Sequence, residues 1–324
     1  MSKIFSMILV IVAVGWASLM CEAQTAERYI FDDDTQEWVS GERVDVPLEG
    51  VAGEARGMID AGQYRQAEKM LKEYLKETST QEEGRVAAML VYADSAFIRD
   101  EYGLADERYR QLIHEYPNTR EFAIALRREF EIAKAWLAGK KKRVLGVLFL
   151  NAADEALEIL SLIEQLAGGF RIAEVALWTQ ADYYYQTGQF ELAEIAYRRL
   201  AQNYHSPRYN KAAMYWSSAS AMATFPGIAY DETPLLDAHE LYTQYRDKYP
   251  QQAQREDIPV ILEQISLKRA QKEYETGRFY CRIRKPEAAA YYFRYVIRNW
   301  PETLFAQQAE LELGKMGKAV EEER

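Results

Sequence analysis

The sequence predicts an all-α fold, a solenoid of about six stacked helical hairpins that follows an N-terminal export signal and an extended arm. A helical phrase recurs along the chain, in which a small residue is followed by a bulky residue four positions later and then by further apolar residues. The phrase often ends near a proline, as it does from Ala105 through Tyr109 to Pro117. Such self-similarity is typical of stacked hairpins, whose product is a binding surface.

The composition agrees with a packed helical protein. Of the 324 residues, 48% are hydrophobic and 28% are charged, and 23 tyrosines supply large side chains for packing between helices. The net charge of -10 disfavours nucleic-acid binding, because an acidic protein repels phosphates unless a basic stripe overrides the repulsion. The compact basic run is residues 139–143 (GKKKR), which suits either a solvated turn or a contact with an anionic lipid or partner.

Residues 1–23 are predicted to form a signal peptide, so that the mature chain lies beyond the cytoplasmic membrane. Residues 4–20 carry no charge, follow a lysine and precede a polar, acidic stretch. Cys21 stands where a bacterial lipoprotein carries its lipidated cysteine, although bulky Met20 occupies a position where a small residue is usual. Cleavage after Ala23 is the alternative, because the small residues there suit the peptidase of soluble export.

Residues 24–50 are predicted to be an extended arm, because they show no sustained helical periodicity and contain turn-forming residues such as Gly41 and Pro47. The run of three aspartates at residues 32–34 suggests a calcium loop, but the glycine and the distant glutamate of such a loop are out of place. We therefore expect a tether with a turn.

Helical pairs are predicted from residue 51 to about residue 315. In each pair a small residue lets two helices approach closely, and a bulky residue one turn later fills the groove beside it. In the first hairpin, Gly62 marks the turn and Ala67 lies on the inner face of the second helix. The second hairpin covers residues 85–116, with its turn near Asp100.

The next two hairpins differ in the length of their turns. The third begins with a long helix over residues 121–138, continues through the basic run, and ends its second helix at Gly168 and Gly169. The fourth has a short turn at Gly188.

The last two hairpins carry the longer insertions. The fifth has an inserted loop at residues 225–234, and the sixth begins with a long helix over residues 256–280. A kink is expected near Pro259, whereas Pro286 suits the first turn of the following helix. Residues 316–324 are predicted to be a charged tail.

The repeat length identifies the kind of solenoid. The small residues of the six second helices are Ala67, Ala105, Ala156, Ala193, Ala238 and Ala289. Their spacings are 38, 51, 37, 45 and 51 residues, which exceed the period of about 34 residues of a tetratricopeptide repeat by insertions of loop or helix size. The sequence therefore predicts a tetratricopeptide-repeat solenoid.

Part of the chain, about residues 190–302, resembles a narrower group, the BamD-type outer-membrane protein assembly lipoproteins. The resemblance rests on residues 203–207 (NYHSP), the helix 212–224 with Tyr215 and Ala219, Asp231 and Pro234 of the inserted loop, Leu241, Tyr242 and Tyr245, Tyr249-Pro250, and residues 299–303 (NWPET). It implies a lipid anchor at Cys21 and a periplasmic scaffold that helps to insert β-barrel proteins. The chain differs from that family by extra hairpins before this region and by a last repeat that is shortened or absent.

No catalytic or metal-binding residue is predicted. The three histidines, His114, His205 and His239, belong to different repeats, and none has a second ligand at helical spacing. The sequence contains no glycine-rich phosphate loop, nucleophile elbow or haem-attachment motif. We therefore expect no enzymatic activity, no metal and no cofactor.

Aromatic residues are the candidates for partner binding. Consecutive helical residues face different directions, so the tyrosine runs at residues 183–185 and 291–292 cannot all point into the stack. The candidates are Tyr183, Tyr184, Trp216, Tyr291 and Tyr292. Packing between adjacent hairpins is the alternative role for each of them.

These features predict a non-catalytic scaffold that binds partner proteins in outer-membrane β-barrel assembly. The expected partners are a barrel-assembly protein or other envelope proteins, and the expected location is the periplasm, at the outer membrane if Cys21 is lipidated. A periplasmic repeat protein that coordinates cell division or peptidoglycan maintenance is the alternative. A carbohydrate-active enzyme built on paired helices would require a deep acidic cleft.

Overall fold

The structure is a computed structural model that describes residues 29–32, 37–40, 48–82, 84–117, 119–144, 148–204 and 207–322. The chain divides into two units, Met1–Pro47 and Leu48–Arg324. The predicted signal peptide, Cys21 and His205 lie outside the described residues.

The first unit contains a two-stranded sheet. β1 (Tyr29–Asp32) and β2 (Glu37–Ser40) pair antiparallel, with Asp32 opposite Glu37. The segment predicted as an extended arm therefore includes a β-hairpin. The β-branched and aromatic residues of these strands, Ile30, Phe31, Trp38 and Val39, are types that favour strands, but the two segments are short and do not alternate with polar residues.

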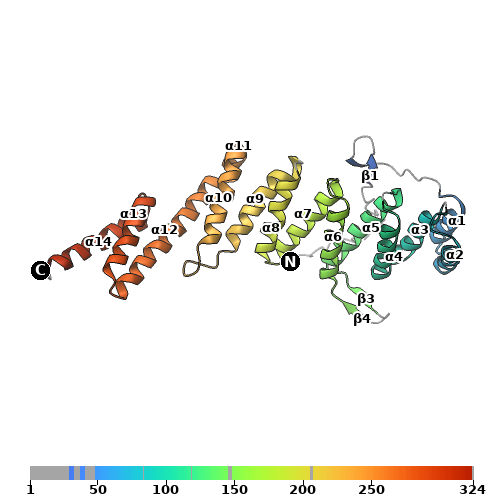
Figure 1. Ribbon diagram of the computed structural model, residues 1–324, viewed down its shortest axis with the longest axis horizontal. Helices are drawn as coiled ribbons and strands as arrows, with labels where there is room; N and C mark the ends of the chain where they lie inside the picture. The colour runs from blue at the N-terminus through green and yellow to red at the C-terminus, as the bar shows by residue number, and fades with distance from the viewer. Residues whose placement is uncertain are drawn as a thin grey trace, which may run out of the picture. The chain divides into compact units, whose positions relative to one another are not determined.

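The described residues of the second unit form fourteen helices, which follow one another in chain order in Figure 1. The helices are α1 (Gly50–Asp60), α2 (Tyr64–Glu77), α3 (Arg85–Ile98), α4 (Tyr102–Glu115), α5 (Arg120–Leu137), α6 (Ala153–Leu166), α7 (Arg171–Gln186), α8 (Phe190–Asn203), α9 (Pro207–Ala223), α10 (Thr233–Lys248), α11 (Pro250–Arg255), α12 (Ile258–Arg282), α13 (Pro286–Asn299) and α14 (Leu304–Glu322). Six hairpins pair α1 with α2, α3 with α4, α5 with α6, α7 with α8, α9 with α10, and α12 with α13. The predicted all-α solenoid of about six helical hairpins is confirmed.

Four of the six hairpins turn in the same way. The second residue after the first helix adopts a left-handed conformation, with φ between 56° and 77°, at Gly62, Asp100, Gly188 and Arg284. Its amide donates to the carbonyl three residues earlier, and the next amide donates to the carbonyl five residues before it, as in Gly62 to Ile59 and the next residue to Met58. This closing pattern caps the helix and reverses the chain within three residues.

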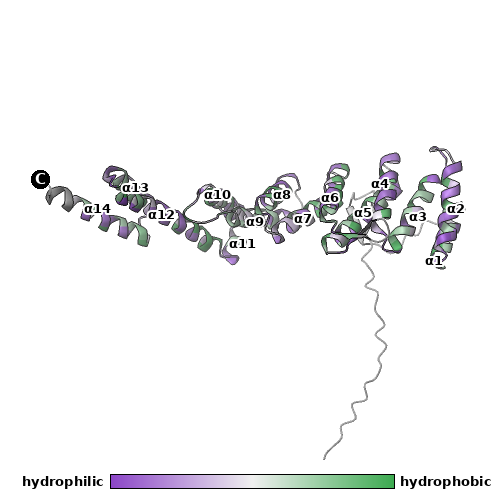
Figure 2. Cartoon of the chain, turned by 90° about the horizontal axis from the view of Figure 1, so that it is seen from below, coloured by the Kyte–Doolittle hydropathy of each residue, from purple (hydrophilic) through white to green (hydrophobic). Residues whose placement is uncertain are grey.

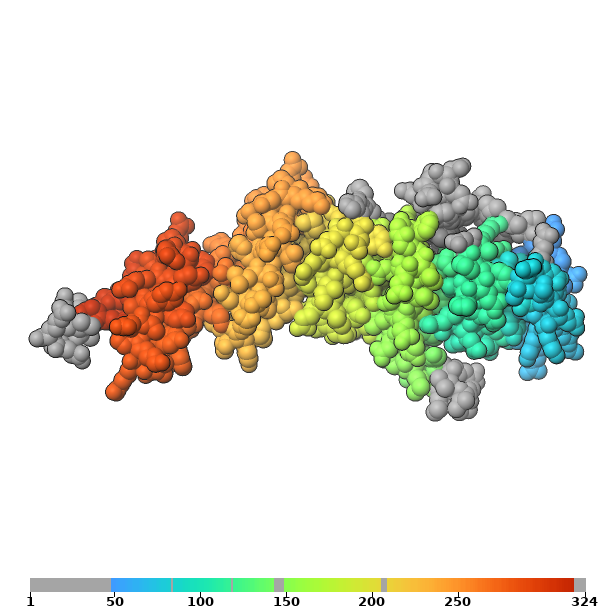
Figure 3. Space-filling view, in the orientation of Figure 1, coloured from blue at the N-terminus to red at the C-terminus, as the bar shows by residue number. Residues whose placement is uncertain are grey.

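The hydrophobic core is divided into clusters that succeed one another along the sequence. Their buried members span residues 52–91, 89–176, 177–213, 221–265 and 270–309. Helices pack mainly against the helix before and the helix after them, and the first helices of the early hairpins also contact one another, as α1 does α3 and α3 does α5. In the space-filling view each coloured segment abuts the segments that precede and follow it (Figure 3). This nearest-neighbour packing defines a helical repeat array.

Neighbouring helices of adjacent hairpins differ in hydrophobicity. α2 carries charged residues over most of its length, whereas α3 is largely apolar and has eight buried residues (Figure 2). The difference arises because α3 is covered on both sides by neighbouring hairpins. No helix among the described residues is both long enough and apolar enough to cross a membrane.

One local expectation was incomplete and another was wrong. The basic run 139–143 begins in a turn at Gly139, but its last two residues belong to β3 (Lys142–Val144), which pairs antiparallel with β4 (Leu148–Leu150) between α5 and α6. Pro259 does not kink a long helix, because it lies in the first turn of α12, where a missing amide hydrogen costs nothing. The chain bends before it, at Asp257, which has a φ of 54°.

Candidate partner-binding surfaces

Hairpin six presents the most exposed aromatic group of the predicted candidates. Tyr291 of α13 is 62% exposed, and its ring lies 5.4 Å from that of Tyr292 and 6.4 Å from that of Tyr295. Tyr292 stacks on Tyr280 of α12, with ring centroids 5.3 Å apart and ring planes 10° from parallel. Phe279 is 46% exposed and meets Tyr280 edge-on. Tyr292 therefore contacts both rings: it stacks on Tyr280 and packs edge-on against the exposed ring of Tyr291.

Cationic side chains surround these rings. Arg282 lies 5.9 Å above the ring of Phe279, and Arg298 lies 5.9 Å above the ring of Tyr295. Arg294 is exposed on the same stripe of α13 as Tyr291, one turn away. Among the described residues, no carboxylate forms an ion pair with any of these three arginines. We call this set of side chains the hairpin-six surface: Phe279, Tyr280, Tyr291, Tyr292, Tyr295, Arg282, Arg294 and Arg298.

At neutral pH the tyrosine Tyr292 of this surface is uncharged. Burial, together with the neighbouring Tyr280 and Glu273, raises the pKa of Tyr292 above its ordinary value. The phenol is therefore a neutral hydrogen-bond donor at neutral pH, and the charge of the surface comes from its arginines.

The predicted residues of α7 are more enclosed. Tyr183 and Tyr184 are both half-buried, and Tyr184 packs against the core cluster of residues 177–213. The hydroxyl of Tyr184 lies 3.4 Å from the side-chain amide of Gln180. Tyr184 also lines a cavity of about 450 Å³ that α4 and α6 share with α7.

Trp216 of α9 is half-buried inside a set of aromatic contacts. Its ring centroid lies 5.0 Å from that of Tyr185, 5.4 Å from that of Tyr215 and 6.4 Å from that of Tyr197. Tyr215 continues the series to Tyr242 of α10. These contacts give Trp216 a packing role between hairpins four and five. Partner binding by Tyr183, Tyr184, Trp216, Tyr291 and Tyr292 stays a prediction, and the hairpin-six surface brings only the last two together.

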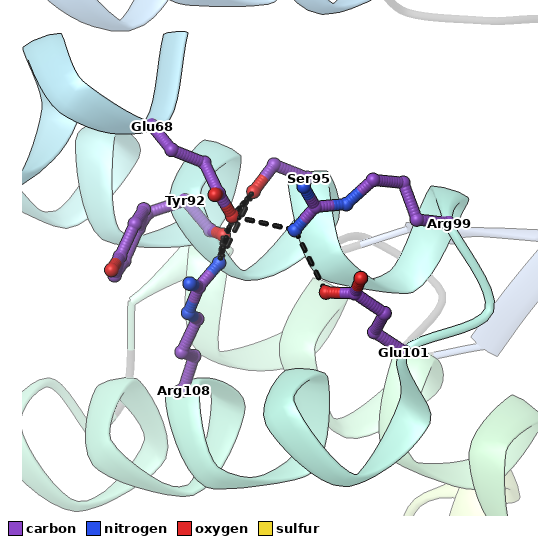
Figure 4. Close-up of polar contacts among 6 residues, drawn as sticks. All are labelled: Glu68, Tyr92, Ser95, Arg99, Glu101 and Arg108. Carbon is purple, nitrogen blue, oxygen red and sulfur yellow. Dashed lines mark hydrogen bonds and ion pairs between the residues drawn. The ribbon is translucent and has the colours of Figure 1, made fainter. Parts of the chain in front are cut away.

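A polar cluster joins the first two hairpins (Figure 4). Oε1 of Glu68 on α2 accepts hydrogen bonds from Arg99 at 2.8 Å, Arg108 at 2.9 Å and Ser95 at 2.9 Å. Arg99 also pairs with Glu101 at 2.9 Å. Burial opposes the charge of Glu68, but the bonds from Arg108 and Ser95 prevail and lower the pKa of its carboxyl. Glu68 thus carries a fixed negative charge between three donors.

Other features offer little chemistry. The described residues contain no group of three side chains that could hold a metal ion. A cavity of about 460 Å³ between α8, α9 and α10 mixes both charge signs, including Arg198, Glu240 and Lys248. Cys281 is half-buried against the core cluster of hairpin six, and burial raises the pKa of its thiol.

Most residues of the hairpin-six surface were not among the predicted binding residues, which include only Tyr291 and Tyr292 of this set. Tyr291, Arg294, Tyr295 and Arg298 follow one another at helical spacing, which is the pattern that could have identified one face of α13. Phe279 and Tyr280 belong to another helix, and only the packing of α12 against α13 places them beside that face.

Helices that pack in sequence order, with aromatic and cationic side chains left exposed, define a helical-repeat protein of the tetratricopeptide type. The sequence matches the family YfiO, described as an outer membrane lipoprotein, over residues 150–319, more than half of the chain. The protein belongs to this family. The match includes α6 to α13 and therefore the hairpin-six surface.

Two solved structures resemble this chain at low sequence identity. The C-terminal part of a TPR repeat-containing protein from Cytophaga hutchinsonii is 12% identical, with a TM-score of 0.36, over 80% of this chain and 86% of that one. PilW, a type IV pilus biogenesis factor, is 18% identical, with a TM-score of 0.29, over 80% of this chain and 96% of that one. Curated proteins give no significant match. Because both TM-scores are low, the assignment depends on the family match and the helix packing.

Proposed function

We propose that the protein is a non-catalytic scaffold of the cell envelope that binds partner proteins during outer-membrane β-barrel assembly. Membership of an outer membrane lipoprotein family supports the compartment, and the repeat array supports the binding role. One observation carries the proposal: within the family-matching region, the hairpin-six surface exposes aromatic and cationic side chains together.

The chemistry of this surface suits a protein partner. Tyrosine and arginine are the residues most often responsible for binding energy at protein interfaces. Tyr291 is held by its neighbours, so little rotamer entropy is lost when a partner covers it. The unpaired arginines favour a partner that presents carboxylates beside apolar side chains. We propose a barrel-assembly protein as that partner.

The N-terminal sequence and the family support a location in the cell envelope. We propose that the chain is exported, lipidated at Cys21 and held at the periplasmic face of the outer membrane. Cleavage after Ala23 would instead release it into the periplasm. The mass of the N-terminal peptide distinguishes an acylated Cys21 from a chain that begins after Ala23.

Affinity capture from envelope membranes tests the function. The baits are the full chain, a variant with Tyr291→Ala and Arg294→Ala, and a control with Tyr230→Ala and Arg255→Ala, which removes an exposed tyrosine and an exposed arginine elsewhere. We expect the full chain and the control to recover a barrel-assembly protein, and the Tyr291/Arg294 variant to recover about ten-fold less. Recovery of only division or peptidoglycan factors would contradict the proposal and favour the alternative envelope role.

A further inference from the structure

A basic cavity lies outside the family-matching region, where α2, α3 and α4 meet. Its volume is about 260 Å³, and its lining includes Lys72 and Lys76 of α2, Arg85 of α3 and Arg108 of α4. Among the described residues no acidic side chain lines it. Four cations around one cavity are unexpected in a chain with a net charge of -10.

Arg108 forms a fixed wall of the cavity. Its Nη1 donates to Glu68 at 2.9 Å and to the carbonyl oxygen of Tyr92 at 2.7 Å (Figure 4). Its guanidinium carbon lies 3.6 Å from the centroid of the Tyr92 ring. Glu68 thus balances the charge of Arg108, and the stacking and hydrogen bonds fix its orientation.

The guanidinium of Arg85 is held by hydrogen bonds from Nη1, but its Nε has no hydrogen-bond partner among the described residues. Its Nη1 donates to the carbonyl oxygen of Thr78 at 2.9 Å and to that of Leu75, which closes the end of α2. Its Nε is buried and has no hydrogen-bond partner among the described residues. A buried N–H group without an acceptor costs free energy, which an anion in the cavity would recover.

Lys72 and Lys76 add two charges that nothing in the described structure balances. Both are exposed, and they lie one helical turn apart on the same face of α2. No carboxylate of the described residues forms an ion pair with either ammonium group. Like charges at this spacing repel each other, so an anion between them would relieve the repulsion.

We propose that this cavity binds a phosphate group, either of an anionic phospholipid headgroup or of free phosphate. The cavity is smaller than the roughly 300–1,000 Å³ of a site for a whole drug-sized ligand, so it suits the charged end of a molecule. Lys72, Lys76 and Arg85 leave three positive charges without a balancing acid, which a phosphate neutralises better than a single carboxylate does. The two lysines can follow the tetrahedral oxygens as flexible point charges, while hydrogen bonds hold Arg85 and Arg108 in place in the cavity lining.

Direct binding measurements on the full chain test this site. The probes are inorganic phosphate, vesicles of phosphatidylglycerol, vesicles of phosphatidylcholine, and a glutamate-rich peptide. The variant is Lys72→Gln with Lys76→Gln, which leaves Arg85 in place because that residue caps α2. The control is Lys134→Gln with Lys315→Gln, which removes two exposed lysines that do not line the cavity. An acyl chain at Cys21 would be common to all three proteins.

We expect the Lys72/Lys76 variant to bind the phosphate-bearing probe at least about ten-fold more weakly than the full chain, and the control to bind it normally. If the variant loses binding of inorganic phosphate, the ligand is free phosphate. If the variant loses binding of phosphatidylglycerol vesicles only, the ligand is a lipid headgroup. Equal binding by all three proteins, binding of neither phosphate nor phosphatidylglycerol, or a loss seen only with the glutamate-rich peptide would overturn the proposal. Circular dichroism of the variant verifies that its helices are intact.

Discussion

Glu129 of α5 and Asp106 of α4 form a buried pair of carboxyl groups. Glu129 is 1% exposed, and Arg110 donates to Asp106 at 2.6 Å. Burial, and then the charge of Asp106, raises the pKa of Glu129 well above its ordinary value of 4.5. Taken as a carboxylate, Glu129 has no hydrogen-bond partner among the described residues. With a proton, it donates to Asp106, so the neutral form is the stable one in the folded protein.

Glu129→Gln is expected to raise the free energy of unfolding at pH 7. The unfolded chain releases the Glu129 proton above about pH 4.5 while the folded chain retains it, so the wild type loses stability as the pH rises from there towards the raised pKa. Each unit of pKa shift corresponds to about 1.4 kcal/mol. Glutamine stays neutral and still donates to Asp106. Urea unfolding at pH 7 and pH 4 measures the effect, and an advantage of the variant that does not shrink at pH 4 would contradict the assignment.

Gly277 of α12 lies against the ring of Phe293 on α13. A Cβ atom there would lie 2.7 Å from Cε1 of Phe293 and 2.9 Å from Cδ1, and the ring is fully buried. Gly277→Ala is therefore expected to lower the free energy of unfolding by about 1–3 kcal/mol, although alanine favours a helix. Gly314→Ala in α14, where nothing lies within 4 Å, is the control and is expected to stabilise slightly. Thermal unfolding compares the two, and a stabilised Gly277→Ala would refute the contact.

At the scale of elements, a polar seam connects the first helices of the first three hairpins. Asp94 of α3 is 2% exposed and accepts a hydrogen bond from Arg56 of α1. The same carboxylate pairs with Arg128 of α5 at 3.6 Å and accepts a hydrogen bond from the hydroxyl of Tyr109. One buried carboxylate thus holds three hairpins in register.

Asp94→Asn is expected to cost about 2–3 kcal/mol of stability, because it removes the charge that two partly buried arginines share. Asp60→Asn, at the exposed end of α1, should change stability by less than about 0.5 kcal/mol. Denaturant unfolding of both variants measures the difference. An Asp94→Asn protein as stable as the wild type would show that the seam does not hold the hairpins together.

The hairpins could be predicted from sequence because the small and bulky residues that recur, such as Ala105 and Tyr109, are the residues that fill the space between two helices. The turn near Asp100 was predicted, but the left-handed conformation of Asp100 and of Arg284 could not be, because those positions lack the glycine that marks such a conformation at Gly62. The basic cavity was also missed, because Lys72 and Arg108 belong to different hairpins and only the packing of α2, α3 and α4 brings them together.

At the scale of the whole molecule, the core clusters succeed one another along the sequence, and most helices contact only near neighbours. Stability in such an array is approximately a sum of local terms. Hydrogen exchange of Gly277→Ala is therefore expected to accelerate at α12, α13 and α14 and to leave α1 to α4 unchanged. Acceleration spread evenly over all helices would indicate a single cooperative unit instead.

We propose that the repeat array binds an envelope protein through the hairpin-six surface, and photo-crosslinking in the native envelope tests this contact. The crosslinking amino acid is placed at position 291, with position 230 as the exposed control. We expect an adduct with a barrel-assembly protein from position 291 and none from position 230. No adduct at position 291, or equal adducts at both positions, would show that the hairpin-six surface is not the binding surface.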